Sequence, residues 1–118
     1  MRFLVVDDSA VDRLHLASLL EELGHQVEAY DSTRGILDKL ATGQYASVFL
    51  DIVMPEKDGY KFLRELRANQ PTAAQHVIFY SSKKTSVEMN YGLTRAGAND
   101  YLAKPISRER LEQALRRI

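Results

Sequence analysis

The sequence predicts an α/β protein built as a doubly wound, five-stranded parallel sheet with five helices. Short, continuous apolar runs recur along the chain, which is typical of strands buried on both faces of a parallel sheet. They alternate with stretches whose apolar residues follow a helical period. The length of 118 residues suits one compact domain, so we expect a single domain over residues 1–118.

The five strands are predicted where β-branched, aromatic and other apolar residues run together. They are expected at Phe3–Val6, Val27–Tyr30, Ser47–Leu50, Val77–Tyr80 and Asp100–Leu102. The second of these runs is the weakest. A doubly wound sheet with the strand order 2-1-3-4-5 has its topological switch point between the first and third strands, which is where such folds place ligands.

The helices are predicted from apolar residues spaced as i, i+3, i+4 and i+7. The first is marked by a stripe at Leu16, Leu19, Leu20 and Leu23. Gly24 stands where a helix C-cap belongs. Three more are expected around Ile36–Leu40, around Phe62–Leu66 and over about Thr85–Ala96. The last helix follows an N-cap at Ser107, with its stripe at Leu111, Ala114, Leu115 and Ile118.

Composition excludes several classes of protein. Lysine and arginine number 16, aspartate and glutamate number 16, and the net charge of zero argues against non-specific binding to nucleic acid or anionic lipid. The absence of cysteine excludes disulfides, thiolate zinc sites and cysteine nucleophiles. No apolar run approaches the roughly 20 residues of a membrane span, and none near the N-terminus suits a signal peptide. We therefore expect a cytoplasmic protein.

Polar residues follow four of the predicted strands at the point where each strand ends. Asp7 and Asp8 follow the first, Asp51 the third, Ser81 the fourth and Lys104 the fifth. The carboxyl ends of parallel strands share one edge of the sheet, so these side chains are expected to meet there. The switch point would bring the three aspartates side by side.

This combination of residue types indicates phosphoryl chemistry. Three carboxylates in one pocket repel each other unless a cation lies among them, and an incomplete all-oxygen cage suits Mg²⁺. A lysine and a hydroxyl on the opposite side would complete a clamp around a phosphoryl group, with a carboxylate as the nucleophile. The sequence thus predicts that one aspartate takes up a phosphoryl group.

Each residue also has an ordinary structural explanation when it is considered alone. Asp7 and Asp8 could cap the first helix, and Asp51 could be a turn residue. Ser81 could be a helix cap, and Lys104 a solvated loop lysine. The coincidence at four strand ends, rather than any one residue, favours a functional site.

Four segments resemble the receiver domain of two-component response regulators. They are Val6-Asp7-Asp8-Ser9, Leu50-Asp51-Ile52-Val53-Met54-Pro55 with Asp58-Gly59, Tyr80-Ser81-Ser82, and Ala96-Gly97-Ala98-Asn99-Asp100-Tyr101-Leu102-Ala103-Lys104-Pro105. The resemblance spans nearly the whole chain and is greatest to stand-alone receivers of the chemotaxis type. It implies a flavodoxin-like fold and a phosphorelay signalling module rather than an enzyme with its own substrate.

The resemblance also implies roles for the residues of the acidic pocket. Asp51 would accept the phosphoryl group from the phosphohistidine of a sensor histidine kinase or a histidine phosphotransfer protein. The metal site would comprise Asp7, Asp8, Asp51 and Val53, with Asp8 ligating Mg²⁺ directly, Asp7 acting through water, and Val53 through its backbone carbonyl. The domain would assist its own phosphorylation and dephosphorylation.

A second group of implied roles concerns the switch. Ser81 and Lys104 would contact the phosphoryl oxygens, and the Lys104-Pro105 bond would be cis. Tyr101 would turn inward as Ser81 is drawn to the phosphoryl group. This would change the face made by the fourth helix, fifth strand and fifth helix, where a downstream effector protein or a second copy would bind. The protein would be a monomer or a phosphorylation-dependent dimer. Lys83 and Lys84 are not part of the resemblance; they could steer anions toward the pocket or belong to a solvated loop, and we favour the loop.

Three alternatives accompany this interpretation. Phosphatases and phosphomutases with an aspartate nucleophile carry a second aspartate two residues later, where this chain has Val53 after Asp51 and Ser9 after Asp7. A flavodoxin-type carrier shares the strand order, but the aspartate pair would repel a flavin phosphate. A degenerate receiver would lack pocket residues that are all present here. We expect a stand-alone regulator, with a receiver cut from a longer chain as the other option.

Overall fold

The computed structural model describes residues 1–55, 57–82, 91 and 95–118. Its five described strands are β1 (Arg2–Val6), β2 (Gln26–Tyr30), β3 (Ser47–Leu50), β4 (Val77–Ser81) and β5 (Asp100–Ala103). Its described helices are α1 (Ala10–Glu22), α2 (Ile36–Leu40), α3 (Gly59–Ala68) and α5 (Arg108–Leu115), with a short 3₁₀ turn, η1 (Gln70–Thr72). Each expected strand is present within one residue of its expected bounds.

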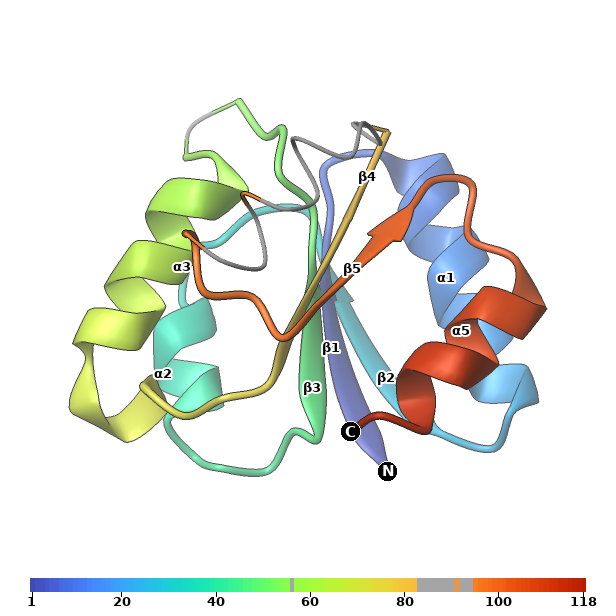
Figure 1. Cartoon of the computed structure of the whole chain (residues 1–118), viewed down its shortest axis with the longest axis horizontal. Coiled ribbons are helices and arrows are strands. Elements are labelled where there is room, and N and C mark those ends of the chain that lie inside the picture. The colour runs from blue at the N-terminus through green and yellow to red at the C-terminus, as the bar shows by residue number, and fades with distance from the viewer. Residues whose placement is uncertain (56, 83–90, 92–94) are drawn as a thin grey trace.

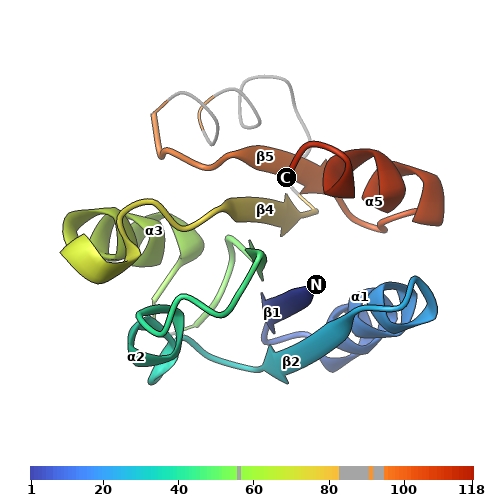
Figure 2. The ribbon, with the colours of Figure 1, turned by 90° about the horizontal axis from the view of Figure 1, so that it is seen from below.

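The strands form one parallel sheet in the order β2-β1-β3-β4-β5. Helices α2 and α3 cover one face of this sheet, and α1 and α5 cover the other (Figure 1, Figure 2). The predicted doubly wound architecture and strand order are therefore confirmed.

The continuous apolar runs arise because the central strands are buried on both faces. Side chains alternate along a strand, so Phe3 and Val5 of β1 join the core beneath α1 and α5, while Leu4 and Val6 join the core beneath α2 and α3. All residues of β3 and β4 are buried, whereas the edge strand β2 is only partly so. This exposure explains why the sequence signal for β2 is the weakest.

Helix caps fix where the helices begin. Ser9 is the N-cap of α1, its hydroxyl accepting the Asp12 N–H at 3.4 Å, so Asp7 and Asp8 do not serve that role. Ser107 caps α5 as predicted. Helix α1 ends at Glu22 with Leu23 as its C-cap, and Gly24 follows with a φ of 87°.

Most of the expected fourth helix, about Thr85–Ala96, lies outside the described residues, as do Lys83 and Lys84. The helices described therefore number four rather than the five predicted. Among the residues that the structure describes, none of the helices combines the length and the apolar character that crossing a membrane requires.

Candidate functional site

The strand register brings the polar strand ends together at one edge of the sheet, the upper edge in Figure 1. Val6 pairs with Leu50, and the Asp51 N–H donates to the Val6 carbonyl at 3.0 Å, so Asp51 lies beside Asp7. On the neighbouring strands, the Lys104 N–H donates to the Ser81 carbonyl at 2.8 Å. The expected convergence of these residues is thus observed.

Asp7, Asp8 and Asp51 form the acidic cluster. Each offers a carboxylate oxygen, and these oxygens all lie within 4.8 Å of one another. Asp7 is fully buried, Asp51 is 4% exposed, and Asp8 is exposed to solvent. Oxygen donors that are open on one side fit a hard divalent cation such as Mg²⁺, which retains part of its water shell.

Lys104 lies against this cluster and forms ion pairs with two of its carboxylates. Its Nζ is 2.8 Å from Asp7 Oδ2, 3.1 Å from Asp12 Oδ2 and 3.4 Å from Asp51 Oδ1. The peptide bond between Lys104 and Pro105 is cis, as expected from the resemblance. One ammonium therefore faces three carboxylates.

The charges in the site are unequally compensated. Burial and the negative charge of Asp7 raise the pKa of Asp51 to about 7, although Lys104 opposes this shift. Burial also acts to raise the pKa of Asp7, but hydrogen bonds from Lys104, Tyr80 and the Ser9 N–H lower it below its usual value. Lys104 satisfies Asp7 more fully than Asp51, so the site has a deficit of positive charge that a divalent cation would fill.

The backbone beneath Asp51 depends on a glycine. The Gly59 N–H, at the start of α3, donates to the Ile52 carbonyl at 2.7 Å. A Cβ at position 59 would collide with the Asp51 carbonyl oxygen and lie 2.9 Å from the Ile52 Cα. Glycine is needed for this close approach, which holds the Asp51 segment against the start of α3.

Ser81 and Tyr101 occupy different positions relative to the acidic cluster. Ser81 is the last residue of β4 and is fully buried at the carboxyl edge. Tyr101 is 4% exposed and packs on the α2 and α3 side of the sheet, its ring 6.1 Å from that of Phe79. The Val53 side chain, in contrast, is 55% exposed.

Two residues of the site were not predicted from the sequence. The Tyr80 hydroxyl donates to Asp7 Oδ2 at 2.7 Å, and Asp12 pairs with Lys104. Tyr80 belongs to an apolar strand run, and Asp12 is an acidic residue in the first turn of a helix, so both fit ordinary patterns. A tyrosine at the carboxyl end of a strand, next to a strand ending in aspartate, is the signal that could have identified Tyr80.

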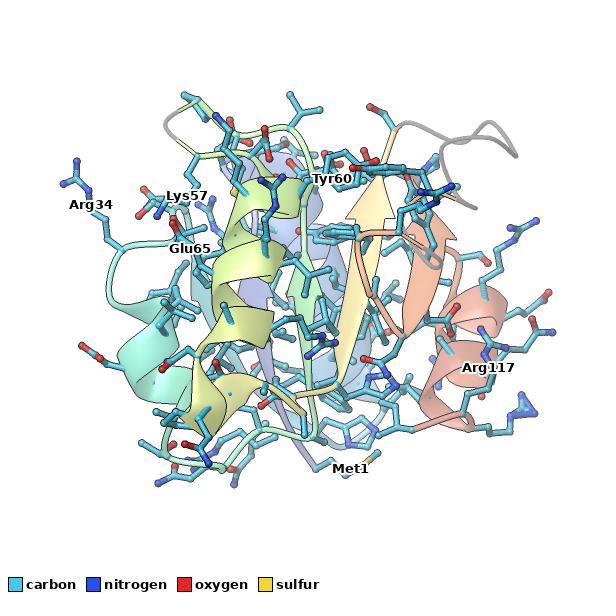
Figure 3. All side chains as sticks on the ribbon, turned by 60° about the vertical axis from the view of Figure 1, so that its left-hand side comes forward. Met1, Arg34, Lys57, Tyr60, Glu65 and Arg117 are labelled. Atoms are coloured by element: carbon cyan, nitrogen blue, oxygen red, sulfur yellow. The ribbon has the colours of Figure 1, made fainter. Side chains whose placement is uncertain are left out.

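An open cavity of about 320 Å³ gives solvent access to the cluster through Asp8. Its walls include Arg34, from the segment after β2, and Pro55 and Lys57, from the segment after β3. Figure 3 shows Arg34 extending outward, while Lys57 lies near Glu65 of α3, with which it pairs at 2.8 Å. The acidic cluster is therefore approached past side chains of both signs.

The sequence model of the response regulator receiver domain matches residues 3–116. Two curated relatives are the sensory/regulatory protein RpfC of Xanthomonas campestris, 33% identical over 98% of this chain, and Protein PilH of Pseudomonas aeruginosa, 38% identical over 93% of it. The match spans only 16% of RpfC but 90% of PilH. PilH therefore supports the expected likeness to stand-alone receivers.

A solved structure extends the comparison to the fold and the site. The receiver domain of the sensor histidine kinase PA1611 of Pseudomonas aeruginosa superposes with a TM-score of 0.86 at 28% identity, covering 98% of this chain and 94% of that one. That domain was solved with a magnesium ion coordinated in its active site cleft. These findings do not favour the alternative of a phosphatase with an aspartate nucleophile.

Proposed function

The chain belongs to the response regulator receiver domain family, a module of two-component signalling, and we propose that Asp51 is its phosphoacceptor. The observation that supports this most strongly is the cluster of Asp7, Asp8 and Asp51 facing the Lys104 ammonium at the carboxyl edge of the sheet. Asp51 has an oxygen within 4.8 Å of those of Asp7 and Asp8 and lies 3.4 Å from the Lys104 Nζ, so it contacts both the acidic cluster and the cation.

The proposed reaction transfers a phosphoryl group from a phosphohistidine to Asp51. A carboxylate oxygen of Asp51 attacks phosphorus, a new P–O bond forms, the P–N bond breaks, and the imidazole leaves with its electron pair and takes up a proton. The product is an acyl phosphate, and attack by water on phosphorus later returns the carboxylate and inorganic phosphate. The domain thereby assists both its phosphorylation and its dephosphorylation.

Asp8 and Asp51 would hold Mg²⁺ directly, with Asp7 acting through water and Val53 through its carbonyl. When bound, the ion supplies positive charge that keeps Asp51 ionised and neutralises phosphoryl oxygens. Lys104 would neutralise a further phosphoryl oxygen. Its Nζ is already 3.4 Å from Asp51 Oδ1, so it would only need to exchange a carboxylate partner for the phosphoryl oxygen.

Ser81 would donate its hydroxyl to the phosphoryl group and thereby couple the site to a binding face. The inward position of Tyr101, beside Phe79, is the one that we expect phosphorylation to favour. The proposed face is made by the fourth helix expected over about Thr85–Ala96, most of which lies outside the described residues, by β5 and by α5, and it would bind a downstream effector protein or a second copy. The proposed phosphodonor is a sensor histidine kinase or a histidine phosphotransfer protein.

Mass spectrometry after treatment with acetyl phosphate and Mg²⁺ tests the assignment of Asp51. We expect the wild-type protein to gain the mass of one phosphoryl group and Asp51→Asn to gain none. Asp38→Asn is the matched control, because Asp38 is an exposed residue of α2 remote from the cluster, and it should be labelled like the wild type. Labelling of Asp51→Asn at the wild-type level would contradict the proposal.

A further inference from the structure

The Tyr80 hydroxyl is buried within the site, although nothing in the proposed phosphoryl transfer uses it. Tyr80 is 1% exposed, and its ring packs in the core beneath α1 and α5, edge-on to Phe49 with the ring centroids 6.5 Å apart. A buried hydroxyl needs a hydrogen-bond partner. Its partner is a carboxylate of the acidic cluster, Asp7, at 2.7 Å.

Three donors from three segments hold the Asp7 carboxylate. The Ser9 N–H donates to Oδ1 at 2.9 Å, and Tyr80 and Lys104 both donate to Oδ2, at 2.7 Å and 2.8 Å. The Lys104 Nζ also lies 4.7 Å from the centre of the Tyr80 ring. Tyr80 therefore contacts both the anion and the cation of this buried pair.

The contribution of Tyr80 differs from that of Lys104 because, within the described part of the chain, the Tyr80 hydroxyl bonds to one carboxylate, Asp7, and Lys104 faces three. Lys104 also faces Asp12 and Asp51, and in the proposed reaction it turns toward the phosphoryl group. The Tyr80 ring is fixed by the core, so its hydroxyl stays on Asp7 when the ammonium moves. Tyr80 and the Ser9 N–H are then the donors that keep the Asp7 carboxylate in place.

We propose that Tyr80 is a positioning residue for divalent-cation binding, with its hydroxyl orienting the Asp7 carboxylate toward the ion and its water shell. This inference rests on the proposed Mg²⁺ site. Outer-shell hydrogen bonds to metal-binding groups commonly matter for affinity, because they fix the ligand orientation before the ion arrives. Hydrogen bonds in a buried network also strengthen one another, so removing one member weakens the bonds that remain.

The substitution Tyr80→Phe tests this role by removing one oxygen atom while keeping the ring in the core and beneath Lys104. Isothermal titration of Mg²⁺ into the protein without a phosphodonor should show binding about tenfold weaker than in the wild type. Tyr45→Phe is the matched control, because the Tyr45 hydroxyl donates to another carboxylate, Glu28, at 2.9 Å outside the site. Tyr45→Phe should bind Mg²⁺ like the wild type.

A double-mutant cycle distinguishes positioning from a general structural effect. If Tyr80 acts through Asp7, Tyr80→Phe should weaken Mg²⁺ binding in the wild-type background but not in the Asp7→Asn background. An equal loss in both backgrounds, or wild-type affinity in Tyr80→Phe, would overturn the inference. Failure of the proposed function looks different, because the wild-type protein itself would then bind no Mg²⁺ and Asp51 would not be labelled.

Discussion

Two cations, Lys104 and Arg67, lie at opposite ends of the parallel sheet, and their surroundings differ in kind. Lys104, at the carboxyl edge, faces three carboxylates with a single ammonium. Arg67, in the last turn of α3, faces the segments that lead into β4 and β5. Among the described residues, its guanidinium donates to neutral oxygens, namely the carbonyls of Ala73, Gln75 and Gly97 and the side chain of Asn99.

The difference separates a cation whose hydrogen-bond partners are neutral from one that faces an excess of carboxylates. Around Arg67, the planar guanidinium is matched to fixed acceptors, and its bonds tie two loops to α3. Around Lys104, charges of one sign outnumber the other, and the pKa of Asp51 is raised to about 7 by burial and by Asp7. At the amino edge, the Arg67 guanidinium has hydrogen-bond partners for its donors. At the carboxyl edge, the negative charge of the carboxylates is balanced only when a further cation or protons bind.

Replacing Lys104 should have the largest effect on stability. Lys104→Met leaves Asp7 buried without its cation, and we expect a loss of roughly 3–5 kcal/mol in the free energy of unfolding near neutral pH. Because Lys104 lowers the pKa of Asp7, the lost contribution is one present above the unfolded value of 3.8 and absent once pH falls through the folded value. Urea denaturation should therefore show a loss that shrinks in acid; a loss independent of pH would contradict this account.

The substitution Asp51→Asn should have the opposite sign. The folded pKa of about 7 exceeds the unfolded value of 3.8, so the ionised Asp51 costs stability, and this cost grows as pH rises between these values. Without Mg²⁺, we expect Asp51→Asn to be more stable than the wild type by roughly 2–3 kcal/mol above pH 7 and nearly equal at about pH 4. Addition of Mg²⁺ should stabilise the wild type and narrow the difference. A destabilised Asp51→Asn would mean that Lys104 fully compensates Asp51.

Arg67→Met applies to the cation with neutral partners the same replacement as Lys104→Met. Loss of its hydrogen bonds to loop carbonyls should lower the free energy of unfolding by about 2 kcal/mol. Arg67 helps burial to lower the pKa of His76, so removing Arg67 makes protonation of His76 in the folded state less costly. The loss should therefore be constant above about pH 7 and become somewhat smaller as pH falls below the ordinary histidine value of 6.5. Phosphorylation of Asp51 and affinity for Mg²⁺ should be unchanged, and a change in either would show that the two edges are coupled.

The sequence predicted which residues meet at the carboxyl edge, because strand topology alone determines this. Every parallel strand ends at the same edge, so Asp7, Asp51, Ser81 and Lys104 could be brought together from the positions of four apolar runs. The burial of β1, β3 and β4 on both faces followed from their continuous apolar character for the same reason.

Contacts that depend on side-chain direction could not be predicted in this way. Tyr80 fits any buried strand, and only the three-dimensional structure shows that its hydroxyl reaches past β3 to Asp7 at the end of β1. Arg67 fits the polar side of any amphipathic helix, and its role depends on how the loops before β4 and β5 fold back toward α3. The sequence also left open which residue caps α1. The structure shows that Ser9 is the N-cap and that the Asp7 carboxylate instead accepts hydrogen bonds from the Ser9 N–H, Tyr80 and Lys104.

The substitution Asp12→Asn should change stability least of the four. It tests how strongly the ion pair with Asp12 restrains the Lys104 ammonium. Its carboxylate is 37% exposed and 3.1 Å from the Lys104 Nζ, so the pair is partly screened by solvent, and Asp12→Asn should cost only about 0.5 kcal/mol. The effect on phosphorylation should be larger than this, because Asp12 competes with the incoming phosphoryl group for Lys104. We expect Asp12→Asn to be phosphorylated faster by acetyl phosphate at saturating Mg²⁺, followed as the rate of mass gain.

The control for Asp12→Asn is Asp31→Asn, which removes an exposed charge from the cavity that leads to Asp8 without touching Lys104. If the general negative potential slows the approach of the phosphodonor, both variants should be faster, and the difference should vanish at high salt. If the pairing of Lys104 limits the reaction, only Asp12→Asn should be faster and salt should have little effect, because that pair is a close contact. The second outcome is the one expected from a site in which one ammonium is shared among three carboxylates.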